Sequence, residues 1–195
     1  MILAYHVIFA CYGFWLPNDP RGSGSDFVRQ SHLKSFGPPT KVTTRHSVAH
    51  QAHDQKRRLV AKTALQRPPV QLTGEQALHV AKGFAAYSHR GSLVIHACCI
   101  MPDHVHMVLA RHRHPIERLV NLLKGAATRE LIQAGVHPLS PAQRANRDSI
   151  WAANTGWVVY LNTPQAIRRC VKYVEMNPVK AGLRPQRWSF CHAVC

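Results

Sequence analysis

Two strand-like runs in the middle of the chain are separated by only three residues. Residues 93–100 and 104–110 are rich in Val, Ile, Leu, Ala and Cys, and Met101-Pro102-Asp103 between them has turn chemistry. So short a connection allows only antiparallel pairing, because parallel neighbours need a crossover of a dozen or more residues. The sequence therefore predicts a β-hairpin at this point.

Two further strands and three helices are expected around the hairpin. Residues 2–11 alternate loosely and contain β-branched and aromatic side chains, which is typical of a half-buried strand, and residues 157–161 form a short strand. Thr73 can cap a helix together with Gln76, three residues later. We expect helices from Thr73 to Gly91, from Pro115 to Gly135, and from Thr163 to about Met176, the last one ended by Pro178 and Gly182.

The order of these elements predicts the fold class. Strand, helix, strand, strand, helix, strand and helix is the order of an α+β protein with a ferredoxin-like antiparallel sheet, and we expect the helices on one face. The 195 residues suit one domain, residues 1–195. A basic, loop-like insertion at about residues 20–72 interrupts it, with a short helix between His53 and Leu65. The insertion is either a solvated basic surface or a surface for nucleic acid phosphates.

The charge balance indicates a polyanionic partner. The chain has 25 Lys and Arg against 9 Asp and Glu, a formal net charge of +16. Nucleic acid is the leading candidate, and an acidic surface or a membrane surface is the alternative. No stretch is long and apolar enough for a membrane helix. The apolar N-terminus has no basic region before it, which favours a strand over a signal peptide. Six cysteines without disulfide-framework spacing favour a reduced, cytoplasmic protein.

The hairpin carries a pair of histidines. On a strand, residues i and i+2 share a face, so His104 and His106 project side by side while Val105 enters the core. Two imidazoles on one face can bind a divalent metal. The chain has 14 histidines, so a purely structural pair is an equally open interpretation at this point.

A tyrosine and an asparagine are paired on the last expected helix. Tyr173 and Asn177 are four residues apart and therefore lie one above the other on the same face. One interpretation makes Tyr173 a core aromatic and Asn177 a residue of the helix end. The other is phosphate chemistry, because a tyrosine beside several cations suits it. The neighbouring cations are Arg168, Arg169, Lys172 and Lys180.

These two motifs together resemble those of a known family. Pro102-Asp103-His104-Val105-His106, followed about seventy residues later by Tyr173-Val174-Glu175-Met176-Asn177-Pro178-Val179-Lys180-Ala181-Gly182, is similar to the REP-associated tyrosine transposases. These are insertion-sequence-200-like, single-tyrosine HUH transposases. The first strand, Tyr5-His6-Val7-Ile8-Phe9, and the closing Trp188-Ser189-Phe190 also look like the family's. Resemblance covers about residues 1–16 and 74–190, and not the basic insertion.

The resemblance implies an activity and a set of site residues. Tyr173 would attack single-stranded or hairpin DNA and form a 5′-phosphotyrosyl bond, and the released 3′-hydroxyl could later rejoin strands. His104, His106 and Asn177 would bind a divalent metal, Mg²⁺ or Mn²⁺. The protein would be a monomer or a homodimer. Basic side chains on the last two helices would then contact DNA phosphates: Lys124, Arg129, Arg168, Arg169 and Lys172.

Three alternatives remain at the level of the sequence. The chain could be a non-catalytic basic nucleic-acid-binding module, which explains the charge but not the two motifs. It could be a rolling-circle-type HUH nickase, although such proteins usually have further domains. A zinc-binding structural protein is disfavoured, because Cys98 and Cys99 would point to opposite faces of a strand.

Overall fold

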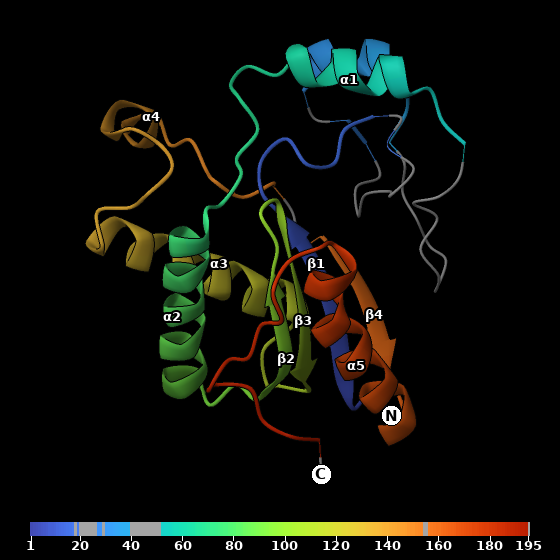
Figure 1. Ribbon diagram of the computed structural model, residues 1–195, viewed down its shortest axis with the longest axis vertical. Helices are drawn as coiled ribbons and strands as arrows, with labels where there is room; N and C mark the ends of the chain where they lie inside the picture. The colour runs from blue at the N-terminus through green and yellow to red at the C-terminus, as the bar shows by residue number, and fades with distance from the viewer. Residues whose placement is uncertain (18, 20–26, 29, 40–51, 154–155, 195) are drawn as a thin grey trace.

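Four strands pair into an antiparallel sheet in the order β2-β3-β1-β4 (Figure 1). The computed structural model describes residues 1–17, 19, 27–28, 30–39, 52–153 and 156–194. The strands in chain order are β1 (Ala4–Ala10), β2 (Ile95–Ile100), β3 (His104–Ala110) and β4 (Trp157–Leu161). The hairpin predicted from the three-residue connection is confirmed as β2 and β3.

Five α-helices and one 3₁₀ helix are present in the described part of the chain. Thr73 and Gln76 form the expected capping box at the start of α2, and the Thr163 side chain accepts a hydrogen bond from the Ala166 backbone N–H at the start of α5. The helices are η1 (Ser31–Phe36), α1 (Gln55–Thr63), α2 (Gly74–Gly91), α3 (Ile116–Gln133), α4 (Pro141–Ala145) and α5 (Pro164–Lys180).

The first strand lies inside the sheet and is buried on both faces. All seven residues of β1 are buried, because β3 and β4 pair with its two edges and helices cover both of its faces. The expectation of a half-buried strand was therefore wrong. The apolar character of Ala4, Val7, Ile8 and Phe9 suits this position, and His6 is the most polar side chain in it.

Helices cover both faces of the sheet, which corrects the expectation of helices on one face (Figure 1). On one face α2 and α3 bury Phe84 and Leu123 against Phe9 and Met107. On the other face α5 buries Val174 against a smaller apolar cluster. Both strand faces therefore have a partner, as the two-sided burial of β1 requires.

Helix α5 ends later than the sequence indicated. Pro178 was expected to end it, but the helix continues through Pro178 to Lys180. Pro178 has no N–H to donate to the Val174 carbonyl, and the helix continues for only two more residues beyond it. Gly182 has a φ of 74°, and Leu183 N–H donates to the Pro178 carbonyl while Gly182 N–H donates to the Val179 carbonyl. This is a Schellman motif, so Gly182 ends the helix as expected.

The described part of the insertion packs on the loop that follows β1. Leu16, Leu33 and Ala61 form a small separate core, and α1 is the short helix expected there. The Arg67 guanidinium lies 3.7 Å from the centroid of the Tyr12 ring and also donates to the Ser149 carbonyl. Residues 20–26 and 40–51 lie outside the described residues, so the proposed role of the whole insertion stays a prediction.

The structure bears on two of the classes considered from composition. Within the residues described, no helix is long and apolar enough to span a membrane. Of the six cysteines, the five that the structure describes are all free thiols. Cys98 and Cys99 lie in different clusters on opposite faces of β2, as the alternation of a strand requires.

Candidate active site

The two histidines of the hairpin stand at the start of β3, on the face that α5 covers. His106 is buried, while His104 is partly exposed. Val105 lies between them and enters the larger core with α2 and α3, as predicted. The antiparallel register places His106 opposite Ile8 and Val108 opposite His6, so His106 and His6 are diagonal neighbours on that face.

Four polar side chains form a continuous row across this face. Asp103 Oδ1 lies 2.7 Å from His104 Nδ1, and His104 Nε2 lies 3.0 Å from His106 Nε2. His106 Nδ1 in turn lies 3.2 Å from His6 Nε2, and those two rings are stacked. Phe14 stacks on the outer side of His104 with ring centroids 4.7 Å apart. Every ring in the row therefore has a fixed orientation.

The buried imidazoles of the row are neutral. Burial lowers the pKa of His106 well below its usual range, and the neighbouring histidines act in the same direction. Burial lowers the pKa of His6 to about 4. Neutral imidazole is the form that binds metal ions, so the protonation state suits a metal ligand.

The spacing of the two Nε2 atoms suits a shared cation. Asp103 holds Nδ1 of His104 and His6 holds Nδ1 of His106, which leaves both Nε2 atoms directed at one another. Two bare lone pairs at 3.0 Å repel, so a proton or a cation lies between them. Neighbouring ligands of an octahedral cation, each at 2.0–2.1 Å, are about 3 Å apart. Among the described residues, no group of three or more His, Cys, Asp or Glu side chains is arranged to hold a metal ion.

Helix α5 brings Tyr173 to the row of histidines. The Tyr173 ring centroid lies 5.8 Å from that of His6 and 5.9 Å from that of His106, and the side chain is 40% exposed. The residue thus touches the buried histidines and still meets solvent. Burial raises the pKa of its phenol. The Lys180 ammonium lies 5.4 Å from the ring centroid.

Asn177 stands one helical turn beyond Tyr173, as its spacing predicted. Its side-chain amide N–H donates to the Tyr173 backbone carbonyl at 3.0 Å. This bond occupies the nitrogen end of the amide and leaves the oxygen as an acceptor. An amide oxygen is a hard donor of the kind that Mg²⁺ and Mn²⁺ accept. Two imidazoles and this amide are therefore a donor set that fits such a cation.

A comparison with known protein families identifies the family of this chain. The family model described as "Transposase IS200 like" matches residues 51–176, which is more than half of the chain. The chain belongs to this transposase family. The resemblance inferred from the two motifs is thereby confirmed, and both motif regions up to Met176 lie inside the matched range.

Searches among individual proteins add two solved structures. No curated protein matches this transposase. A REP-associated tyrosine transposase bound to a REP hairpin is 12% identical, with a TM-score of 0.47, over 93% of this chain and 70% of that chain. A protein from Deinococcus radiodurans R1, provisionally described as a transposase, is 18% identical, with a TM-score of 0.45, over 90% of each chain. Both TM-scores are below 0.5, so the fold assignment rests on the sheet and helices described above.

The basic residues expected to contact DNA occupy three different settings in this transposase. Arg168, Arg169 and Lys172 are exposed on α5, the helix that carries Tyr173. Arg129 is exposed on α3, which covers the opposite face of the sheet. Their contacts with phosphates remain predictions.

Lys124 departs from the exposed position that was expected for it. It is only 8% exposed, its ammonium donates to the Ala152 carbonyl at 3.1 Å, and it lies 5.5 Å from the centroid of the Phe9 ring. Burial lowers its pKa to about 8. Lys124 was expected among the DNA-contacting side chains, and its contact with the loop before β4 was not foreseen. The structure therefore supports a role in packing, not a phosphate contact.

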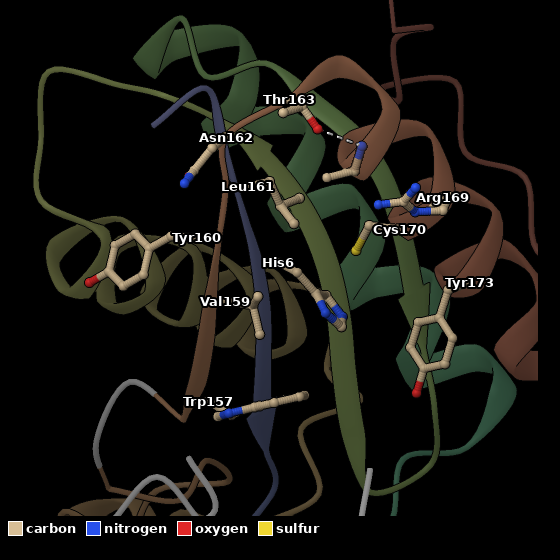
Figure 2. A pocket seen from close by; sticks show the side chains of 11 residues that line it. His6, Trp157, Val159, Tyr160, Leu161, Asn162, Thr163, Arg169, Cys170 and Tyr173 are labelled. Carbon is tan, nitrogen blue, oxygen red and sulfur yellow. Dashed lines mark hydrogen bonds between the residues drawn. The ribbon is translucent and has the colours of Figure 1, made fainter. Parts of the chain in front are cut away.

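A groove opens beside Tyr173 between β4 and α5 (Figure 2). Its floor comes from the α5-facing side chains of β1 and β4, namely His6, Trp157, Val159 and Leu161. Its wall comes from Ala166, Arg169, Cys170 and Tyr173 of α5. The cavity is about 560 Å³, within the range of pockets that hold small organic groups.

Sequence reasoning missed two members of the row. His6 and Asp103 were quoted as parts of the motifs that resemble the family, and neither was given a role at the site. A histidine at the centre of an apolar strand is itself a signal, because a buried imidazole needs a hydrogen-bond partner. Which residue that partner is depends on the pairing of β1 with β3, which no local pattern reveals.

Proposed function

We propose that this chain is a single-strand-specific DNA transposase that cleaves and rejoins hairpin-flanked DNA through a covalent 5′-phosphotyrosine intermediate. One observation carries the proposal: the partly exposed Tyr173 contacts the buried His106, whose Nε2 lies 3.0 Å from Nε2 of His104. Tyrosine is a phosphoryl nucleophile, and the histidine pair supports a cation at the reacting phosphate.

Tyr173 is the nucleophile of the proposed reaction. Its phenol oxygen forms a bond to phosphorus while the bond from phosphorus to the 3′ oxygen of the upstream nucleotide breaks. The phenol proton is lost, and the departing oxygen takes up a proton to become a 3′-hydroxyl. The reverse attack of a 3′-hydroxyl on the phosphotyrosine releases the tyrosine and joins strands without further energy, because the phosphotyrosyl ester retains the energy of the broken phosphodiester bond.

The surrounding residues position the reacting groups and balance charge. His104, His106 and Asn177 would hold Mg²⁺ or Mn²⁺, which when bound would polarise the phosphoryl oxygens and offset their negative charge. Asp103 contacts Nδ1 of His104 and His6 contacts Nδ1 of His106, and these contacts fix the orientation of the two imidazoles. Burial raises the pKa of the Tyr173 phenol, and a side-chain hydrogen bond with Asn177 acts in the opposite direction, which favours the phenolate.

The DNA strand has a basic path to follow toward Tyr173. Arg168, Arg169 and Lys172 lie on the same helix as the nucleophile and would contact phosphates, and Arg129 would contact a more distant part of the hairpin. We expect the protein to act as a monomer or a homodimer, in the cytoplasm, where DNA is accessible.

The test is the formation of a covalent protein–DNA adduct. A panel of hairpin oligonucleotides with different single-stranded flanks is incubated with Mn²⁺ or Mg²⁺ and analysed on denaturing gels. A 5′-phosphotyrosyl bond retains the DNA downstream of the break, so a 3′-end label moves with the protein and a 5′-end label does not. The band should disappear in Tyr173→Phe and His104→Ala.

Tyr160→Phe is the matched control, because the Tyr160 ring packs on Tyr5 on the opposite face of the sheet. This variant should retain the adduct. If wild-type protein binds the oligonucleotides but forms no adduct with either metal, the protein is a basic nucleic-acid-binding module, which the net charge of +16 favours. Adduct formation and cleavage without rejoining would instead indicate a rolling-circle-type HUH nickase.

A further inference from the structure

We propose that the groove between β4 and α5 binds one unpaired nucleotide of the substrate strand, next to the phosphate that Tyr173 attacks, with its base on Trp157. The inference rests on the proposed function for the identity of the strand. It assigns nucleotide binding to Trp157, Val159 and Leu161, which take no part in the proposed cleavage reaction.

The groove exists because α5 lies across the sheet unevenly. The helix packs mainly on β2 and β3 and only lightly on β4, the edge strand on the other side of β1. The α5-facing side chains of β1 and β4 are therefore left partly uncovered. Pairing places Trp157 opposite Ile8, and Val159 opposite His6, so both belong to this face.

The lining suits the two chemical parts of a nucleotide. Trp157 is half-buried and its ring meets His6 edge to face at 6.1 Å, which holds it while leaving ring surface in the groove. Val159 and Leu161 continue the apolar floor beyond it. An indole ring and an apolar floor accept the face of any base. The exposed guanidinium of Arg169 stands on the opposite wall, where it can pair with a phosphate.

The position of the groove points to the substrate strand and not to another ligand. Tyr173 lines the groove, so an occupant lies against the nucleophile (Figure 2). His6 lines the same groove and also contacts the histidine pair through His106. A nucleotide bound here is therefore continuous with the reacting phosphate. A base held on Trp157 would also be unstacked from its neighbours, which explains selection for single-stranded DNA at the cleavage point.

Tyr160 provides a matched control on the same strand. It lies between Val159 and Leu161, but its ring packs on Tyr5 on the opposite face, with centroids 5.7 Å apart. In Figure 2 its side chain points away from His6 and Tyr173. Tyr160 also borders the groove, but its ring lies on the Tyr5 side of the sheet, so Tyr160→Ala removes an aromatic ring from β4 while Trp157, Val159 and Leu161 stay in place.

The experiment measures binding apart from chemistry. All variants carry Tyr173→Phe and are studied in EDTA, by fluorescence anisotropy of labelled hairpin oligonucleotides with single-stranded flanks. Trp157→Ala should weaken binding about 5- to 150-fold, the range that loss of a stacking aromatic gives. Trp157→Phe, which keeps a ring, should retain most of the affinity. Tyr160→Ala should bind like the parent protein, and thermal unfolding checks that each variant is folded.

An abasic scan then locates the bound nucleotide. The bases of the flank are removed one at a time, and each oligonucleotide is measured with the parent protein and with Trp157→Ala. At one abasic position the difference in affinity between these two proteins should disappear, since the base and the ring act as one interaction. That position should adjoin the cleavage point.

The outcomes separate this inference from the proposed function. If Trp157→Ala binds as well as Tyr160→Ala, or if no abasic position removes its effect, the groove does not bind a base. An adduct from wild-type protein together with that result would leave the transposase chemistry intact and reject only the groove. A base-specific effect of Trp157 without any adduct would instead support the groove in a non-catalytic binding protein.

Discussion

His6 Nε2 lies 3.2 Å from His106 Nδ1, so the central strand of the sheet holds the buried histidine of its neighbour. When His106 Nε2 faces a cation, its proton must be on Nδ1, and His6 Nε2 is the acceptor for that proton. When no cation is present, the same pair can reverse the direction of donation, and the Nε2–H of His106 then points at His104. The His6 ring thereby sets which nitrogen of His106 is available.

Loss of the His6 acceptor should therefore weaken metal binding. We expect His6→Leu to lower the affinity for Mn²⁺ by about 10- to 100-fold, the usual effect of removing a hydrogen-bond partner of a ligand. His6→Gln keeps a carbonyl acceptor and should lose less. The measurement is the free Mn²⁺ signal in electron paramagnetic resonance titrations, which does not depend on DNA cleavage.

A histidine elsewhere on the surface provides the comparison. His79 on α2 is paired with Glu130 at 3.1 Å, on the side of the sheet away from α5. His79→Leu should leave the Mn²⁺ affinity unchanged. Equal losses in His6→Leu, His6→Gln and His79→Leu would reject a positioning role for His6.

Asn177 should affect cleavage without affecting DNA affinity. Asn177→Ala removes the amide oxygen proposed as a metal ligand, and we expect adduct formation to fall by at least about tenfold. Hairpin affinity in EDTA should be unchanged, because Asn177 is not among the residues proposed to contact DNA. Asn177→Gln retains the oxygen and should recover part of the activity.

Asn121, which is exposed on α3, is a suitable control for this pair. Asn121→Ala should retain both adduct formation and affinity. A parallel loss of affinity and adduct in Asn177→Ala would show that the residue supports the helix and not the reaction.

Lys124 should make stability rise with pH above neutrality. Its folded-state pKa of about 8 is below the ordinary value of 10.5, so between these values the unfolded chain binds more protons than the folded one. The free energy of unfolding therefore increases with pH across that window, by about 3 kcal/mol for the full shift. Below pH 8 the lysine is charged in both states and contributes no slope.

The contribution is measured as a difference between two proteins. Buried thiols such as Cys11, whose pKa is raised to about 12, act in the opposite direction above pH 9. Urea unfolding of wild type and of Lys124→Met at pH 7.5 and pH 10 removes this common term. Wild type should gain stability relative to Lys124→Met as the pH rises, and parallel curves would contradict the shifted pKa.

Gly83 should be intolerant of even one methyl group. A Cβ at this position would lie 2.6 Å from Ala127 Cα and 2.8 Å from the Ala126 carbonyl oxygen, where α2 crosses α3. Backbone atoms cannot move aside as a side chain can. We expect Gly83→Ala to lower the free energy of unfolding by about 1–3 kcal/mol, measured by urea denaturation.

Gly74 offers the reference substitution in the same helix. A Cβ there meets nothing within 4 Å. Gly74→Ala should leave stability unchanged or raise it by less than about 1 kcal/mol. If Gly83→Ala is as stable as Gly74→Ala, the two helices can separate without cost.

Local patterns predicted much of this fold. The hairpin, the shared face of His104 and His106, and the capped starts of α2 and α5 depend on residues within a few positions of one another. Such features follow from strand alternation and from helix capping alone. The spacing of Tyr173 and Asn177 on one helix face belongs to the same class.

The features that were missed depend on long-range packing. The burial of β1 on both faces depends on helices packed on both sides of the sheet, and the hydrogen bond between His6 and His106 joins residues 100 positions apart. Lys124 was placed in solvent because its partner, the Ala152 carbonyl, lies in a loop that follows another helix. Neither relationship leaves a periodic signal in the sequence.

The place of β1 inside the sheet has a consequence for synthesis at the ribosome. Ala4 pairs with Ala110 on one side and with Leu161 on the other, so its outer partner is made 157 residues later. At 5–20 residues per second, this apolar strand has an unpaired edge for roughly 8–30 s before β4 is synthesised. A translational pause between the hairpin and β4 would lengthen that wait. The risk that follows from this topology is aggregation of the nascent chain, more than instability of the finished sheet.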